Sequence, residues 1–484
     1  MNILIPRLRL QSETAWSIVA IVASSAFILV SFWLPFSWPL YVICFGLAAI
    51  AIIVTPEAGL LTVIVATMIF ERWFTLQPIE LFDQVIKFYP IDLVIIITLV
   101  SVLIRRLFGP HLRLSDRPFG GALWLWVVVI SMAGILSLFD ETANPELIGS
   151  TVKNFALYGV MYWLAINIVR TAAQFHRFIG ALVFGAVAII PILIYGLIVG
   201  QGLWAEYVPL STAGTRFLGE PHSFYVAGLF ILLINWLVAR PAWGRREITA
   251  LMTILAWGVG IVASLQRHLW LGLVAVSGIL IASYQAVHRR QLLRIAGLGL
   301  IAVALAVVVT LWWSSWQVTT NPLENDLLRS AQLRVVSLFS DDGSDSSTVW
   351  RLTSWYRAWQ LWQEHWLFGI GFGHLISFSI GELDFSVEIR ELHNNFIGLV
   401  LQLGLIGLGL ALYLVSRIGL AFWRYQGRLR GSQRQWFVGF FALAVLFLWS
   451  ANFSVYFDVN ALSIFFWLSL AGMRISQRLG LAAY

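Results

Sequence analysis

The chain has 484 residues, of which 60% are hydrophobic and only 11% charged, with a mean hydropathy of +0.84. So few charges exclude a soluble protein of this size and indicate a polytopic membrane protein. The single cysteine, Cys44, excludes an intrachain disulfide and argues against a metal–thiolate site. The basic pI of about 9.7 comes without a basic stretch with interleaved aromatics, which argues against nucleic acid as a partner.

Apolar runs long enough to cross a bilayer recur along the chain. The first run follows Arg7 and Arg9 and is succeeded at once by another, which favours an uncleaved first helix over a signal sequence. We expect an all-α polytopic membrane protein with about 12 to 14 transmembrane helices. The spans are expected near 15–35, 38–54, 58–75, 89–107, 119–139, 151–169, 177–200, 223–239, 249–265, 269–287, 294–314, 394–416, 435–452 and 459–473.

The distribution of charge orients these spans. With the N-terminus inside, the inner segments hold 21 of the 31 Lys and Arg but only four of the 24 Asp and Glu. The positive-inside rule therefore predicts that both termini are cytoplasmic and that the one large loop, about 316–393, is extracytoplasmic. Almost no ionisable residue falls in the middle of a span, which argues against an ion-coupled transporter.

Two short outer loops carry arginines. Arg216 lies in the loop 211–223, and Glu220, Pro221 and His222 follow it at the start of the next span, where free backbone N–H groups favour an anion. The tight turn 264–270 holds Arg267 close to the membrane surface. Either arginine could instead be a surface cation that extends toward lipid headgroups.

The large outer loop has two halves. Residues 316–348 are polar and acidic and read as a surface segment or a cap. The second half places Trp355, Trp359, Trp362 and Trp366 at helical spacing, extended by Arg351, which predicts a helix in the outer interface that either anchors the protein or contacts substrate. A glycine-rich turn, 367–374, follows it and is too apolar for a nucleotide phosphate loop.

The loop ends with Glu391, Leu392, His393, Asn394 and Asn395 at the start of the long glycine-punctuated span 394–416. A neutral imidazole can accept a proton from a hydroxyl near pH 7, and the acid two residues earlier could orient it. Either asparagine could simply cap the helix. We predict that His393 and Glu391 are catalytic. The competing interpretation is that His393 is a bystander at a helix start.

These residues together resemble the O-antigen ligase and O-antigen polymerase superfamily of bacterial envelope glycosyltransferases. Three local matches carry the resemblance over roughly 210–415. They are Leu392 to Phe396 with the glycine-containing run 403–408, Arg351 to Trp355 with His365 and the turn 368–373, and Arg267 to Gly272.

The resemblance implies a type-C-like glycosyltransferase fold in the bacterial inner membrane, with its active site on the periplasmic side. It implies transfer of a glycan from a polyprenyl diphosphate such as undecaprenyl diphosphate to a sugar hydroxyl of an acceptor glycan or glycolipid, without a metal or nucleotide cofactor. By position, Arg216 and Arg267 resemble the diphosphate-binding arginines and His393 the histidine near the acceptor. Glu220, His222, Arg351 and Asn394 are candidates for further substrate contacts. The chain has Pro221-His222 where the family favours Pro-Asn, so the roles of Glu220 and His222 stay open.

We divide the chain into N-terminal transmembrane helices (1–200), core helices with the arginine loops (201–315), the large loop (316–393) and C-terminal helices (394–484). Chain-length or flippase proteins are candidate partners in polysaccharide or lipopolysaccharide biosynthesis. Polymerase and ligase differ only in the acceptor, and the residues do not separate them. From other classes, a small-anion transporter of the bicarbonate type, or a structural envelope-assembly protein, remains the alternative.

Overall fold

The computed structural model describes most of the chain. The described residues are 4–31, 34, 37–71, 79–81, 84–86, 89–108, 119–199, 218–240, 243–264, 266–284, 288–295, 297, 346–379 and 386–481. Most of the predicted span 294–314, the polar half of the large loop up to residue 345, and Arg216 lie outside them.

The described part is an all-α membrane protein, as the sequence predicts. Each predicted span except 294–314 coincides with a helix or a pair of helices. The helices are α1 (Leu4–Ser31), α2 (Trp38–Val54), α3 (Pro56–Phe70), α5 (Pro90–Phe108), α6 (Gly120–Ser137), α7 (Pro145–Phe155), α8 (Val160–Ile168), α9 (Ala172–Val199), α10 (Glu220–Val238), α11 (Arg245–Ala263), α12 (Arg267–Ser283), α15 (Ser346–Glu364), α16 (Asn395–Tyr425), α17 (Gly431–Ser450) and α18 (Asn460–Leu481). Within the described ranges, five stretches are long and apolar enough to cross a membrane: Ser12–Ser31, Gly120–Ser137, Ala172–Tyr195, Glu220–Val238 and Asn395–Tyr425.

The predicted span 151–169 is a broken helix. Asn144 caps the start of α7, where its side chain accepts hydrogen bonds from the backbone N–H groups of Glu146 and Leu147. The helix stops at Phe155, and a 3-10 turn, Leu157–Gly159, leads into α8. The hydrophobic run alone does not reveal this break, because apolar residues continue through it.

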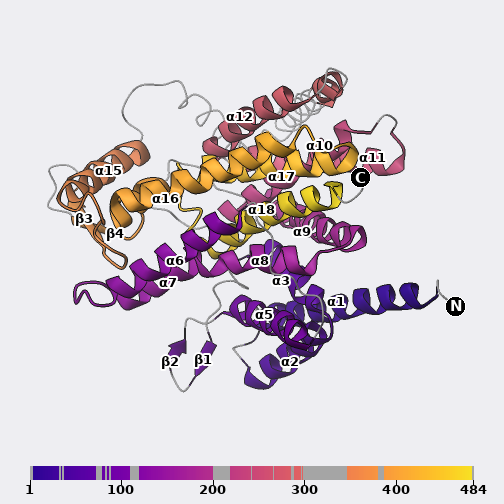
Figure 1. Cartoon of the computed structure of the whole chain (residues 1–484), viewed down its shortest axis with the longest axis horizontal. Coiled ribbons are helices and arrows are strands. Elements are labelled where there is room, and N and C mark those ends of the chain that lie inside the picture. Colours follow the sequence, from indigo (N-terminus) through magenta and orange to yellow (C-terminus); the bar gives the residue numbers. More distant parts are fainter. Residues whose placement is uncertain are drawn as a thin grey trace, which may run out of the picture.

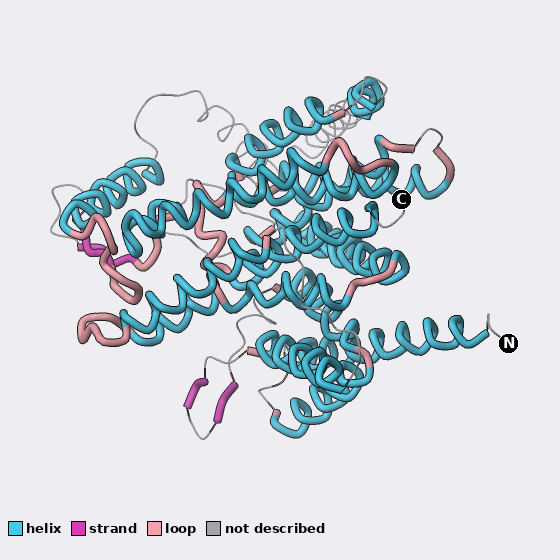
Figure 2. The backbone as a smooth tube through the Cα atoms, in the orientation of Figure 1, coloured by secondary structure: helices cyan, strands magenta, loops and turns pink. Residues whose placement is uncertain are grey.

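The long axes of most helices run in a similar direction (Figure 1). We call the end that carries α15 and the strands β3 (Ile376–Ser379) and β4 (Ser386–Ile389) the loop end. Both chain termini lie toward the opposite end, which we call the terminal end (Figure 1). A second two-stranded hairpin, β1 (Ile79–Leu81) with β2 (Gln84–Ile86), lies beside α5, and Figure 2 shows how little of the described chain is strand. The assignment of the terminal end to the cytoplasm stays a prediction.

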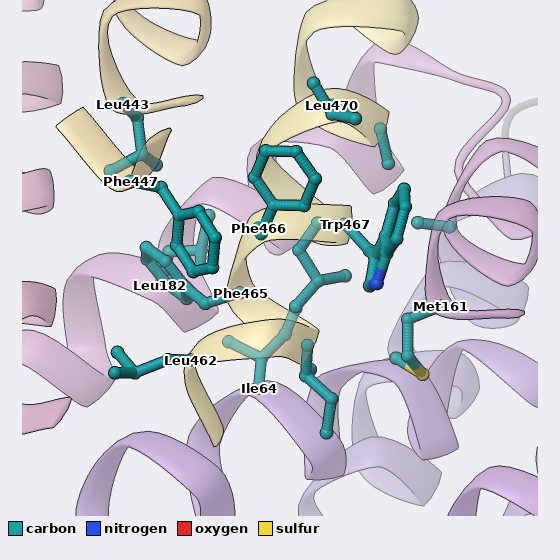
Figure 3. Packing of buried hydrophobic residues seen from close by; sticks show 14 of the residues in the cluster. Ile64, Met161, Leu182, Leu443, Phe447, Leu462, Phe465, Phe466, Trp467 and Leu470 are labelled. Atoms are coloured by element: carbon teal, nitrogen blue, oxygen red, sulfur yellow. The ribbon is translucent and has the colours of Figure 1, made fainter. Parts of the chain in front are cut away.

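One continuous apolar core joins the N-terminal helices to the C-terminal pair. Its centre lies where α18 packs against α17 and α8, and it contains Phe447, Phe466 and Trp467 (Figure 3). The rings of Phe447 and Phe466 stack with centroids 4.6 Å apart. Because α18 also contacts α3 and α7, the four ranges proposed from the sequence interleave in space, and that division stays a prediction.

Arginines at the terminal end satisfy the carbonyl groups at helix C-termini. A helix leaves its last four carbonyls without intrahelical partners, and a cation there also complements the helix dipole. The donors and acceptors are Arg105 with Ile53 and Val54, Arg478 with Ile166 and Val169, Arg289 with Tyr284, and Arg434 with Ser283 and Gln426. The basic residues that orient the chain in the sequence are thus also helix caps in the fold.

Candidate active site

The loop end contains a second, smaller apolar core that surrounds the predicted catalytic segment. Strands β3 and β4 pair antiparallel, with Ile376 opposite Ile389. Together with α15 they enclose a cluster of Trp350, Ala358, Ile376, Phe378, Leu392 and Leu401, with Trp355 and Trp362 packed against it. The start of α16 is therefore embedded in a folded cap.

The predicted indole face is divided between two surroundings. Trp355 and Trp362 pack against this small core, whereas Trp359 is 53% exposed and Trp366 lies beyond the end of α15. The exposed side of the helix also carries Tyr356, which suits the predicted interfacial position. Trp350, which the sequence argument passed over, is 8% exposed.

The glycine-rich turn is inserted into a break in α16. Gly404 has φ 61° and ψ −147°, so the helix is interrupted there. The turn fills the break through backbone hydrogen bonds, in which Ile370 N donates to Leu401 O (2.9 Å) and Gly371 N to Gln402 O (3.0 Å), and Leu405 N donates to Trp366 O (3.0 Å). Backbone groups that lose their helical partners at membrane depth need hydrogen-bond partners from elsewhere in the protein, and this turn supplies them.

The same turn is tied to the connection between α6 and α7. Phe372 N donates to the Ser137 hydroxyl at 2.8 Å, and Asn144 N donates to Gly373 O at 3.0 Å. His374 Nε2 lies 3.2 Å from Asp140 Oδ2. Gly369, Gly371 and Gly373 all have positive φ, which explains why this contact needs glycines.

His393, two residues before the first residue of α16, has φ 49°, in the left-handed region. This conformation costs about 1 kcal/mol for a residue with a Cβ, although histidine adopts it more often than most residues. Its half-buried ring lies edge-to-face with Trp350, with centroids 4.9 Å apart. The indole N–H of Trp355 donates to the carbonyl of the preceding Leu392 at 2.8 Å.

The two asparagines have structural partners. The Asn394 side chain caps α16 by accepting from Phe396 N and Ile397 N, both at 3.0 Å, so the capping interpretation holds for this residue. Asn395 is bound to the segment 451–459 between α17 and α18. Its Nδ2 donates to Asp458 Oδ2 at 2.6 Å, and its Oδ1 accepts from Phe457 N at 3.0 Å.

A small pocket lies beside these residues, and Glu391 contributes to it. It is lined by polar groups from the stretch 390–402 and from the connection before α18, namely Arg390, Glu391, Asn394, Asn395, Gln402 and Asp458, together with apolar side chains that include Phe155 and Val455. Carboxylates, amides and a guanidinium offer both acceptors and donors, which suits sugar hydroxyls.

The two carboxyl groups of this pocket are unusual. Burial, and the nearby Glu391 charge, raise the pKa of Asp458 to about 7. Burial also raises the pKa of Glu391, against the lowering effect of Arg390, whose Nε lies 3.6 Å from Glu391 Oε1. Two carboxylates in one site disfavour double ionisation, which adds to the effect of burial on the pKa of Asp458. Orientation of His393 by Glu391 stays a prediction.

Asp458 is not among the site residues predicted from the sequence. It is one outer acid among many, and it is 63 residues from its partner Asn395. The only available signal was a carboxylate in a short outer connection between two apolar spans, which is too weak to select it.

A second polar cluster is built around His268, the residue after the predicted diphosphate arginine. Arg267 and His268 form the first turn of α12, and Arg267 is half-buried. His268 Nε2 lies 3.1 Å from the hydroxyl of Tyr456 and 3.8 Å from Glu220 Oε1, at the first turn of α10. Glu220 is thus brought next to the Arg267 turn, as its predicted role in the same site requires.

The segment 451–459 connects the two clusters. Tyr456 contacts His268, and Asp458, two residues later, contacts Asn395. Ala451 O also accepts from Asn395 N at 2.8 Å. The first turns of α12 and α16, which lie beside the predicted Arg267 and His393, are therefore both bound to this one connection.

His222 does not line this surface. Its side chain is fully buried, with Nδ1 3.1 Å from Glu71 Oε2 and Nε2 3.3 Å from Ile69 O. Glu71 also lies against Gly219, the N-cap of α10. The anion expected near this helix start is thus supplied by the chain itself, and we do not keep His222 as a substrate contact.

Arg351 lies half-buried on α15, one residue after Trp350. Its predicted contact with substrate stays a prediction. Among the described residues, no group of three or more His, Cys, Asp or Glu is arranged to hold a metal ion.

Residues 250–412, about a third of the chain, match the O-antigen ligase family. The match supports the resemblance to the O-antigen ligase and polymerase superfamily. No curated protein matches the chain.

The O-antigen ligase match begins in α11 and ends in α16, so it includes Arg267, α15 and the segment from Glu391 to Asn394. Glu220 and Asp458 lie outside the matched residues and join the site only through the fold. The match supports a membrane glycosyltransferase of the O-antigen ligase or polymerase type and does not favour the small-anion transporter.

Proposed function

We propose that the protein transfers a glycan from a polyprenyl diphosphate to a sugar hydroxyl on the extracytoplasmic side of the bacterial inner membrane. The observation that carries the proposal is a pocket lined by carboxylates and amides, which include Glu391 and the residues on both sides of His393 in the chain, at an O-antigen ligase-family segment. The pocket is the proposed place of the acceptor hydroxyl.

In the proposed reaction the acceptor O–H bond breaks, and His393 takes the proton. The acceptor oxygen forms a bond to the anomeric carbon, and the bond from that carbon to the diphosphate oxygen breaks. Polyprenyl diphosphate leaves with the electron pair. The permanently charged guanidinium of Arg267, together with Arg216, would stabilise the leaving anion through forked hydrogen bonds.

The apolar tail of the donor also fits the surroundings. A polyprenyl chain requires an enzyme whose reactive groups lie at the boundary of the bilayer. The loop end provides this, because its polar clusters stand at the first turns of α10, α12 and α16, whose remaining lengths are apolar.

Purified protein in lipid nanodiscs, incubated with a polyprenyl-diphosphate oligosaccharide with and without a glycolipid acceptor, tests the proposal. A product ladder from donor alone identifies a polymerase, and a single product that requires the acceptor identifies a ligase. His393→Ala and Arg267→Ala are each expected to lower transfer by at least about a hundredfold, as loss of a proton acceptor or of charge stabilisation does. His176→Ala, an exposed histidine at the start of α9, is the matched control.

Transfer at the wild-type rate by either site variant would remove that residue from the mechanism. No product with any lipid-linked donor, from protein that is folded and inserted, would refute the proposed reaction.

A further inference from the structure

We infer that α15 positions the His393 side chain through the indoles of Trp350 and Trp355, so that these two tryptophans are positioning residues for the proposed base. The inference rests on the proposed function only for the role of His393. The contacts that support it are independent of any reaction.

The backbone of His393 is held on both sides. Its left-handed φ of 49° is unfavourable for a residue with a side chain, so its neighbours have to fix it. On one side, Leu392 is buried in the small core and its carbonyl accepts the Trp355 N–H at 2.8 Å. On the other side, Asn394 caps α16. The Trp355 bond is the contact that comes from a different element.

The ring of His393 is held by the second indole. Trp350 lies edge-to-face with it at 4.9 Å, with an angle of 76° between the planes. Trp350 is itself fixed, because it is buried and packs against Phe378 of β3 with centroids 6.1 Å apart. A rigid aromatic wall on one side of an imidazole restricts its rotation.

Tryptophans on this helix also have a simpler use, which is anchoring in the membrane interface. The position of each tryptophan on α15 distinguishes anchoring in the membrane interface from positioning of His393. Trp359 is on the same helix but 53% exposed, so it can anchor the helix and cannot hold His393. If anchoring were the whole role of α15, Trp359 would matter at least as much as Trp355.

The experiment compares Trp355→Phe, Trp350→Leu and Trp350→Phe with the control Trp359→Phe. The first readout is the rate at which diethyl pyrocarbonate modifies His393 in folded protein, followed by peptide mass spectrometry. The second is glycan transfer, resolved into kcat and KM for the donor. The first readout needs no activity, so it stands even if the proposed function fails.

We expect Trp355→Phe to lower kcat on the order of fivefold, the effect of one lost hydrogen bond, with KM for the donor unchanged. Modification of His393 should become several times faster, on the order of fivefold, because the ring is no longer confined. Trp350→Leu should show the same changes, Trp350→Phe should restore most of the wild-type behaviour, and Trp359→Phe should change neither readout.

An unchanged modification rate in both Trp355→Phe and Trp350→Leu would overturn the inference. So would equal effects from Trp359→Phe. If Trp350→Leu fails to fold, Trp355→Phe, which keeps an aromatic ring in the core, decides the matter alone. Full transfer activity in His393→Ala would refute the proposed catalytic role of His393, while the modification rates would still report whether the indoles confine it.

Discussion

Replacing Gly404 with alanine should destabilise the protein strongly, because the break in α16 leaves no room for a side chain. A Cβ at this position would lie 2.4 Å from the carbonyl carbon and oxygen of Leu367 and 2.7 Å from Phe368 N. These are backbone atoms, so the contact cannot be relieved by turning a neighbouring side chain. The φ of 61° with ψ −147° adds conformational strain for any residue with a Cβ.

The magnitude follows from these two effects. Strain at such a backbone conformation costs about 1–3 kcal/mol, and overpacking of a well-filled site about 1–3 kcal/mol more. We therefore expect Gly404→Ala to lower the stability by about 2–6 kcal/mol. Gly409→Ala on the same helix is the matched control, because a Cβ there meets nothing within 4 Å and alanine favours a helix over glycine by about 1 kcal/mol.

Thermal unfolding in detergent measures the effect. Tryptophan fluorescence reports the whole protein, and a thiol-reactive dye reports exposure of the buried Cys44. Gly404→Ala should unfold well below wild type by tryptophan fluorescence, and Gly409→Ala at or slightly above it. Equal midpoints for the two variants would show that the turn is not inserted in the helix as described.

Two further variants test the buried charges. Asp458→Asn keeps an acceptor for Asn395 but removes the acid, whose pKa of about 7 in the folded state lies above its ordinary 3.8. Because the folded-state pKa is raised, Asp458 makes a contribution to stability that is fully present below about pH 4. This contribution, about 4 kcal/mol, is lost as the pH rises to about 7. Wild-type melting points should therefore fall from pH 4 to pH 7 and those of Asp458→Asn should fall less; parallel curves would contradict this. Arg177→Gln leaves Glu57, which is 2% exposed, without its ion pair of 2.5 Å, and should cost about 3 kcal/mol. The double variant with Glu57→Gln should recover most of that loss, and a purely additive result would show that the pair is not coupled.

Much of the fold could be predicted because the relevant signal is local. The expected span 38–54 is the helix α2 with the same bounds. The interrupted helices were not predictable. The break after Phe155 lies inside a continuous apolar run, and the break at Gly404 depends on hydrogen bonds from the turn 366–371, more than thirty residues earlier.

The candidate site was predicted in part for a similar reason. Arg267 could be chosen because outer basic residues beside apolar spans are few in this sequence, and His393 because it stands at a helix start with Glu391 two residues before it. The partners of these residues could not be chosen, since Asp458 and Tyr456 are ordinary loop residues until the fold brings them to Asn395 and His268. The indoles were recognised as a helical pattern, but the pattern did not reveal which of them face inward.

The sequence by itself determined that this is a membrane protein, where most of its helices lie, and which segment resembles the family. It could do so because hydrophobicity and short motifs depend on neighbouring residues only. The tertiary structure alone decided how the site is held. It placed the segment 451–459 between the two polar clusters, the two carboxyls in one pocket, and the indoles of α15 against His393. These relations join residues far apart in the chain, and they follow from how rigid helices pack rather than from any local preference.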